Sequence, residues 1–408
     1  MRKLYPILIT LLFLTGCSQN SKKQEKAMLS VHLLNTVNTY VAGDKIHLNF
    51  KVDGDSFPTL WLKNAFGTSI ITATQEENHI QFKLPLAYSQ KAGICHWALI
   101  FNNTKVASGK IHLEPNIKSP AHLESYFGPR SITAGDIDYS MLVCIPTDAY
   151  DNPLSQGTPI IIKHQFEDTI TRTPTNTRNL IAWKNVPATN KSGRILVSSS
   201  YDKTHSKELT TIVFPATASD FEIDQERVHS YADGNQIINF KTSIIRDRFN
   251  NIVSDGTLVS FITKDDTGAL LQAFGNTING VAKAQMLHPN EKSSWETTAY
   301  ITGAARSNTL PLDFKAAVTD FELSFSQDQR TITIGPMNSF MDQLVPDGIG
   351  ILLKITGTDG EVVETMTTTS RNGLGVFKLS RNLFKKDTYQ IEVRAAGITK
   401  KQTHTIYE

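Results

Sequence analysis

The sequence has few cysteines and little net charge, and each shortage excludes a class of protein. Three cysteines among 408 residues exclude a disulfide-dense scaffold. The 41 Lys and Arg residues nearly balance the 39 Asp and Glu residues, which excludes bulk basicity as a means of binding nucleic acid or an anionic membrane. Hydrophobic residues make up 40% of the chain, which excludes wholesale disorder. The length allows about two to four domains.

Long apolar runs are also scarce. The one such run covers Leu4 to Leu14 and follows the cationic Arg2 and Lys3. It is too short for a membrane-spanning helix, which needs about 20 residues. A cationic start followed by a short apolar run is typical of a secretory signal peptide. Both excess positive charges lie in this segment, so a chain that starts at residue 17 is formally neutral.

The apolar run ends in Leu14-Thr15-Gly16-Cys17, which resembles the lipobox of bacterial lipoproteins. The resemblance implies that residues 1–16 are a lipoprotein signal peptide, that Cys17 carries acyl chains, and that residues 17–28 tether the protein to a membrane. In the same resemblance, Ser18 after the cysteine implies delivery to the outer membrane of a Gram-negative bacterium, within the cell envelope. The alternative is an ordinary cleaved signal with an incidental cysteine.

From about residue 29 the sequence consists of short alternating strands separated by turn residues, and segments of it recur. Residues 214–222 recur at 314–322, and residues 148–152 recur at 247–251. An element resembling Ala-Gly-Asp recurs at 42–44, 134–136, 232–234 and 346–348. The repeats divide the chain into four units of Ig-like size, namely 29–116, 117–217, 218–317 and 318–408. The prediction is an all-β fold of four tandem immunoglobulin-like β-sandwich domains in an elongated array.

The recurring residues have predicted local roles. Asp148 and Asp247 end a strand, and each can cap the following turn through a side-chain oxygen. We expect left-handed backbone at Asn152 and Asn251. The remaining turn signals are glycines that follow these motifs and Asn-Gly hairpins, at Gly157, Gly256, Asn279-Gly280 and Asn372-Gly373.

Alternation along one strand predicts a buried face. Ile238, Phe240 and Ile244 fall on one side of the strand by the period of two.

The middle units resemble the bacterial Ig-like repeats of the invasin/intimin type. The residues that match the pattern of that family are Asp247, Asn251, Gly256, Val259, Phe261, Gly275, Gly280 and Ala282. Unit 2 keeps only Asp148, Asn152 and Gly157, and in unit 4 residues 359–362 stand loosely for the strand-end turn. The resemblance implies a rod of Ig-like sandwiches that presents or spaces something at a bacterial surface.

Unit 1 departs from this pattern and holds one of the two cysteines that follow Cys17. Cys95, Trp97 and Leu99 share one strand face, and we expect Trp61 to pack in the same core. Cys95 and Cys144 lie in different units. Two buried thiols are favoured by their apolar strands, and an interdomain disulfide is the alternative.

The sequence contains no recognisable catalytic or metal-binding signature. Zinc, P-loop and serine-hydrolase motifs are missing, so we expect no catalytic residues, no metal and no cofactor. Acidic residues surround Phe221 and Phe321 at the unit junctions. Calcium could bind there, but alternation of Phe with acids favours a connecting strand whose Phe plugs the interface.

These observations predict a non-catalytic cell-envelope lipoprotein that acts in adhesion or binding at the bacterial surface. Its partners would be a membrane, through the lipid on Cys17, and an unidentified protein or glycan, but not nucleic acid. The alternative is an accessory lipoprotein of a secretion, pilus or conjugation apparatus.

Overall fold

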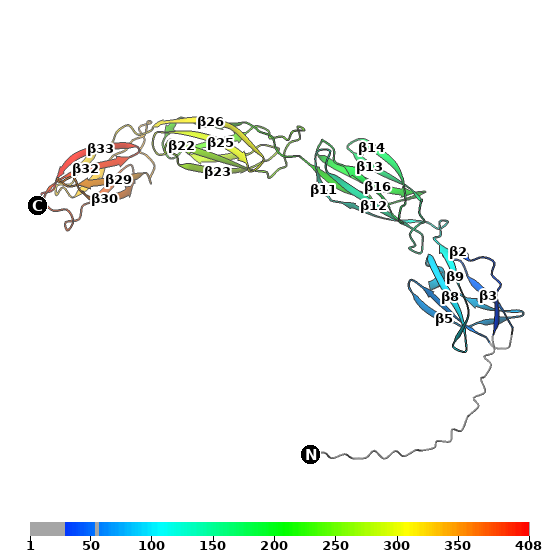
Figure 1. Cartoon of the computed structure of the whole chain (residues 1–408). Helices are drawn as coiled ribbons and strands as arrows, with labels where there is room; N and C mark the ends of the chain where they lie inside the picture. Colours follow the sequence, from blue (N-terminus) through cyan, green and yellow to red (C-terminus); the bar gives the residue numbers. More distant parts are fainter. Residues whose placement is uncertain (1–28, 54–56, 408) are drawn as a thin grey trace, which may run out of the picture.

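A computed structural model describes residues 29–53 and 57–407 of the chain, and these are built almost entirely from β-strands (Figure 1). The strands form eight sheets, which pair into four sandwiches that follow one another in a curved row. The one helix of the described residues is a single turn, α1 (Leu86–Ser89), and no described helix is long and apolar enough to cross a membrane. The predicted fold of four tandem Ig-like β-sandwiches is confirmed.

Sandwich 1 packs a four-stranded sheet against a five-stranded one. In spatial order the first is β1 (Ser30–Leu33), β3 (His47–Asp53), β7 (His79–Lys83) and β6 (Thr74–Glu76). The second is β2 (Thr39–Val41), β9 (Thr104–Glu114), β8 (Gly93–Phe101), β4 (Thr59–Asn64) and β5 (Gly67–Ile71). The short strand β2 runs parallel to β9, whereas the other neighbours are antiparallel.

Sandwiches 2 and 3 repeat this plan with a three-stranded sheet in place of the first. In sandwich 2 this sheet is β10 (His122–Gly128), β12 (Tyr139–Thr147) and β15 (Ala182–Pro187). Its partner sheet is β11 (Ser131–Thr133), β18 (Leu209–Phe214), β16 (Gly193–Tyr201), β13 (Pro159–Phe166) and β14 (Thr169–Asn176), with β17 (Thr204–His205) paired to β16. In sandwich 3 the first sheet is β19 (Ile223–Glu226), β21 (Ile237–Thr242) and β24 (Lys283–Leu287). The second is β20 (Tyr231–Ala232), β26 (Ala305–Ala316), β25 (Ser293–Ile301), β22 (Leu258–Asp265) and β23 (Leu270–Asn276).

Sandwich 4 has a three-stranded and a four-stranded sheet. The first is β27 (Leu323–Phe325), β28 (Thr331–Ile334) and β31 (Gly375–Lys378). The second is β30 (Val362–Thr369), β29 (Gly350–Thr356), β32 (Thr388–Ala395) and β33 (Ile398–Thr405). Each of the four sandwiches buries its own cluster of apolar side chains between its two sheets. The array is therefore a row of separately packed units joined at their ends.

The period-two patterns locate most core positions, with two corrections. Cys95, Trp97 and Leu99 are buried together in sandwich 1 as expected. Trp61 is 45% exposed, so its predicted place in the core is wrong. Strand β4 directs Leu60 and Leu62 inward, and the alternation therefore turns Trp61 outward.

The strand that begins near Ile237 shows the second correction. Ile238 and Phe240 are buried, but Ile244 is 48% exposed, and Ile245 is buried in its place. Strand β21 ends at Thr242, and beyond that point the period of two no longer holds.

The turn signals are mostly confirmed. Gly157 and Gly256 have φ values of 86° and 84°, and the Asn-Gly pairs at 279–280 and 372–373 have positive φ at both residues, as a tight hairpin requires. The left-handed residues of the strand-end turns are Asp151 and Asn250, each one position before the asparagine that we expected. The side chains of the asparagines form hydrogen bonds with the preceding sandwich.

Candidate functional site at the sandwich junctions

The repeated Asp-x-x-x-Asn segments lie where consecutive sandwiches meet. In sandwich 2, Oδ1 of Asp148 accepts hydrogen bonds from the backbone N–H groups of Tyr150 and Asn152 at 2.8 and 2.9 Å. Its other oxygen accepts a 2.8 Å bond from the backbone N–H of Asn116, in the segment that joins sandwiches 1 and 2. The predicted turn cap is confirmed, and the same carboxylate also holds the linker.

Asp247 repeats this geometry at the next junction. Its Oδ1 accepts hydrogen bonds from the backbone N–H groups of Phe249 and Asn251, both at 2.9 Å. Its Oδ2 accepts a 2.7 Å bond from the backbone N–H of Ala216, in the linker between sandwiches 2 and 3. Both carboxylates are buried, so each one fixes three backbone donors in water-poor surroundings.

The asparagine of each segment reaches back into the preceding sandwich. Asn152 accepts a 2.8 Å bond from the backbone N–H of Ala92 and donates one of 2.8 Å to the carbonyl of Gln90. Asn251 does the same with Ser192 and Asn190, again at 2.8 Å each. A side-chain amide that pairs both its donor and its acceptor with one loop fixes orientation as well as distance. We call this arrangement of Asp, Asn, linker and loop the junction clamp.

An aromatic residue inside each clamp fits against a glycine of the preceding sandwich. A Cβ atom added at Gly43 would meet the hydroxyl end of the Tyr150 ring, and Gly43 has a φ of 93°, so glycine lets this ring approach the backbone without strain. At the second junction Phe249 lies beside Gly135 and packs against the core of sandwich 2. The recurrent Ala-Gly-Asp element is therefore part of the contact surface that receives the next sandwich.

The clamp also sets the protonation of its carboxylates. Burial by itself would raise the pKa of Asp148 and of Asp247. Hydrogen bonds from the clamp asparagine and from the backbone outweigh burial, and both pKa values lie below the ordinary value of 3.8. The ionised form is therefore the one that holds the junction together.

At the third junction, the equivalent turn has the same backbone hydrogen bonds but different residues. In sandwich 4 the turn at 339–343 has the backbone bonds of the clamp turns, from Ser339 N–H to the Gln343 carbonyl and from Asp342 N–H to the Ser339 carbonyl. Ser339 and Gln343 thus replace the clamp Asp and Asn. The expectation that residues 359–362 would take this place is wrong, because they lie at the turn between β29 and β30 and at the start of β30.

Stacked aromatic rings replace the clamp at the third junction. The ring of Phe340 stacks on Tyr231 of sandwich 3 with centroids 3.8 Å apart, and it meets His229 at 4.8 Å. His288, behind them, is buried, and its Nδ1 lies 2.8 Å from the carbonyl of Tyr231. Burial is the main cause that lowers the pKa of His288, so its neutral form is favoured.

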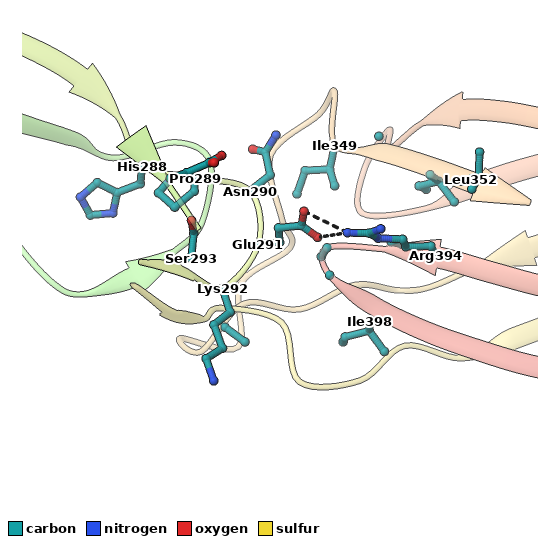
Figure 2. Close-up of a pocket in the computed structure, with 18 of the residues that line it drawn as sticks. His288, Pro289, Asn290, Glu291, Lys292, Ser293, Ile349, Leu352, Arg394 and Ile398 are labelled. Atoms are coloured by element: carbon teal, nitrogen blue, oxygen red, sulfur yellow. Dashed lines mark hydrogen bonds and ion pairs between the residues drawn. The ribbon is translucent and has the colours of Figure 1, made fainter. Parts of the chain in front are cut away.

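A cavity of about 1390 Å³ opens beside this third contact (Figure 2). One ion pair crosses it, from Arg394 of β32 to Glu291 of sandwich 3 at 2.9 Å. Gly397, in the turn after β32, lies so close to Glu291 that an added Cβ would be 2.8 Å from the Glu291 Cβ. Sandwiches 3 and 4 therefore touch through a hairpin tip, an exposed ion pair and the Phe340 stack, with open space between them.

The other predicted junction residues lie elsewhere than expected. Phe221 and Phe321 are buried in the cores of sandwiches 3 and 4, not in the interfaces. Asp220 accepts a 3.0 Å bond from the backbone N–H of Arg306, and Asp320 pairs with Lys400 at 2.6 Å. These carboxylates are occupied by donors of their own sandwiches.

The remaining predicted site residues are the cysteines. Cys17, the predicted lipidation site, lies outside the described residues. Cys95 and Cys144 are both free thiols, buried in sandwiches 1 and 2. Burial is the main cause that raises the pKa of each thiol, which keeps it protonated and unreactive. Residues 29–53 and 57–407 hold no group of three or more His, Cys, Asp or Glu that could bind a metal ion.

The sandwiches and their clamps define the class of protein, a tandem array of Ig-like β-sandwiches fixed end to end. No protein-family model and no curated protein matches the sequence. Among solved structures the chain is similar to FdeC, an Escherichia coli adhesin, with a TM-score of 0.48 and 14% identity over 71% of this chain and 97% of that one. It is also similar to invasin, described as a bacterial integrin-binding protein (TM-score 0.44, 11% identity, 93% and 79% of the two chains), and to Yersinia pseudotuberculosis InvD (0.40, 12%, 86% and 97%).

Proposed function

We propose that this chain is a non-catalytic, lipid-anchored rod of the bacterial cell envelope that carries binding surfaces away from a membrane. In this proposal residues 1–16 are removed, Cys17 is acylated, and residues 17–28 connect the anchor to sandwich 1. The protein acts in adhesion or binding at the cell surface, with a protein or glycan as its partner.

The observation that carries the proposal is the clamp that recurs at two successive junctions. Domains that are joined only by a flexible linker move independently, so a row of several domains is not stiff by itself. Here a buried, ionised Asp holds each linker, and an Asn holds the preceding loop, so orientation is fixed at both junctions. Junctions held by buried polar groups keep consecutive sandwiches in one orientation, so the array stays extended, as a spacer or a display rod requires.

The dimensions suit this role. Strands of nine residues such as β12 and β16 give a sandwich about 35–40 Å long with its loops, at about 3.3 Å per residue. Four in a row reach on the order of 140 Å along the array. Cells that display the rod outward would hold sandwich 4 far beyond the lipid surface.

Protease accessibility on intact cells tests the proposal. We expect an added protease to remove the sandwiches from cells that express the wild-type chain, and the Cys17→Ser variant to leave the membrane fraction. Mass analysis of the purified wild-type protein should show acyl chains at Cys17. Full protection on intact cells, with digestion only after the outer membrane is opened, would contradict surface display and favour the accessory role in an envelope apparatus.

A further inference from the structure

The outward face of one sheet in sandwich 1 carries an aromatic side chain that the core does not use. This sheet contains β4, β5, β8 and β9, which Figure 1 labels in part. Trp61 is 45% exposed at the middle of β4, and its cross-strand partners are Ile70 on β5 and Ala98 on β8. A large indole left exposed on a strand forgoes the stabilisation that burial would give. Such a side chain is suited to contact a partner.

A hollow lies next to the indole. The small side chains of Ala98 and Ser108 stand beside Trp61 in one row across the strands, and they leave a cavity of about 460 Å³. That size falls within the usual range for small-ligand sites. The hollow is lined by Trp61, Lys63, His96, Trp97, Ala98, Lys105, Ser108, Gly109 and Lys110.

Positive charge gathers around the hollow in strand register. Lys63 lies opposite His96, and His96 lies opposite Lys110, so the three form the row next to that of Trp61. Lys105 adds a third amine at the rim. The rim of the hollow therefore offers the charge of three amines to an anionic partner.

Acidic side chains are nearly missing from this face. Among the described outward positions of the sheet one carboxylate occurs, that of Glu114 at the end of β9. The opposite sheet of the same sandwich is mixed, since Lys51 and Lys83 share it with Asp53 and Glu76. The excess of positive charge is therefore a property of one face, not of the whole sandwich.

We propose that this face binds an acidic polysaccharide, with carboxylate-bearing sugars held by the lysines and one sugar ring stacked on Trp61. The lysines supply ionic bonds to carboxylates, and the exposed indole offers a flat apolar surface to the C–H groups of a sugar ring. Lys63 and Lys110 are two strands apart, about 10 Å, so one carboxylate cannot bridge both and a polymer with repeated charges fits better.

This inference rests on the proposed role in binding. It places one binding site on sandwich 1, not at the far end of the array. The two proposals fail separately. Surface display is read on intact cells, whereas glycan binding is read on purified protein in solution.

The experiment uses the mature chain with Cys17→Ser and oligomers of polygalacturonate as the probe, followed by titration calorimetry at low salt. We expect binding that is absent with neutral dextran and that weakens as added salt screens the charges. Trp61→Ala should weaken binding at least about fivefold. Replacing the three lysines together, as Lys63→Ala/Lys105→Ala/Lys110→Ala, should weaken it about tenfold or more.

Matched controls separate this face from the rest of the protein. Trp183, on sandwich 2, is 48% exposed, so Trp183→Ala removes an equally exposed indole. Lys51→Ala/Lys83→Ala removes amines from the opposite sheet. Neither control should change binding, and thermal unfolding should confirm that every variant is folded. Three results would each overturn the proposal: no binding of the probe, equal losses in the controls, or equally tight and Trp61-independent binding of polyglutamate or of vesicles with 30 mol% phosphatidylglycerol.

Discussion

Asp247 shows how one side chain connects a turn with a linker. Its two carboxylate oxygens receive three backbone N–H groups, one of which belongs to the linker before sandwich 3. Hydrogen bonds to a charged group are worth about 1.5–3 kcal/mol each, and a buried donor left without an acceptor costs free energy. The clamp therefore stabilises the sandwich that contains the aspartate as well as the junction.

We predict that Asp247→Ala lowers the free energy of unfolding of sandwich 3 by about 2–4 kcal/mol, because three backbone donors, one of them in a buried contact, lose their acceptor. Hydrogen exchange followed by mass spectrometry during a urea titration reads each sandwich separately. Peptides from β21 and β22 should exchange at lower urea concentration than in the wild type, and peptides from β29 and β32 should not change. Asp168→Ala, at an exposed turn of sandwich 2, is the control and should leave all peptides unchanged.

The pKa of both clamp aspartates predicts a pH dependence. Each pKa is lower in the folded state than the ordinary value of 3.8, so the folded state binds fewer protons around that pH. Their stabilisation is complete above about 3.8 and is lost as the pH falls through the lower folded-state values. Asp148→Asn/Asp247→Asn should therefore be less stable than the wild type at pH 7, and the difference should shrink below pH 3.8. Urea unfolding at several pH values measures it, and a difference that grows on acidification would contradict the assignment.

At the scale of elements, the Asn279-Gly280 hairpin fixes a close contact in sandwich 3. Gly280 has a φ of 77°, and an added Cβ would lie 2.6 Å from Cγ2 of Ile252 and 3.3 Å from the carbonyl oxygen of Ile245. Gly268 has a φ of 86°, but an added Cβ would meet nothing within 4 Å. Both glycines have a left-handed backbone, but only Gly280 has close neighbours. Comparing the two positions therefore distinguishes the cost of backbone strain from the cost of a steric clash.

We predict that Gly280→Ala destabilises sandwich 3 by about 2–4 kcal/mol, whereas Gly268→Ala costs only the strain of left-handed backbone, about 1–2 kcal/mol. Hydrogen exchange of peptides from β24 and β25 during a urea titration measures both variants in the same sandwich. Equal losses would show that conformation alone, and not the contact with Ile252, requires glycine at position 280.

The Phe340 turn is the element that sets the third junction. Removing its ring with Phe340→Ala takes away the stack on Tyr231 and leaves the exposed Glu291–Arg394 ion pair, which alone is worth about 0–1 kcal/mol. We expect sandwich 4 to swing more widely, with little effect on the folding of either sandwich. Spin labels at Lys264→Cys and Lys378→Cys should give a broader distance distribution in the variant. Phe274→Ala, which removes a more exposed ring from β23, away from the junction stack, should leave the distribution unchanged.

Much of this local structure could be predicted from the sequence, because turns and strand faces depend on near neighbours. The Asn-Gly hairpins and the cap of Asp148 follow from backbone preferences of single residues. The sequence does not place Trp61 and Ile244 correctly, because alternation does not say which face is the core or where a strand ends. The role of Asn152 was not predictable, because its partners Gln90 and Ala92 lie about 60 residues away in another sandwich. Its only signal is the recurrence of the asparagine beside two of the three domain boundaries.

At the scale of the whole molecule, the four sandwiches have separate cores, so the shape of the array depends on the junctions between them. Each apolar cluster stays within its own sandwich, apart from Phe249, which packs against the core of the sandwich before its own. The junctions therefore contribute little hydrophobic burial. Directional hydrogen bonds set the course of the array in Figure 1 at the first two junctions, and the Phe340 stack sets it at the third. The repeats in the sequence predicted the row of sandwiches, but its curvature depends on side chains that meet across boundaries.

The clamps should therefore control the extension of the array in solution. We predict that Asp148→Ala/Asp247→Ala turns the first two junctions into flexible links, since the linker N–H groups lose their acceptors while each core stays intact. Small-angle X-ray scattering should show a smaller maximum dimension and a more flexible Kratky profile than in the wild type. Asp168→Ala/Glu296→Ala removes the same charge from exposed positions outside the junctions and should scatter like the wild type. If the double clamp variant kept the wild-type profile with both sandwiches folded, ring contacts such as Tyr150 on Gly43 would be sufficient to hold the array, and the hydrogen bonds would serve only the turns.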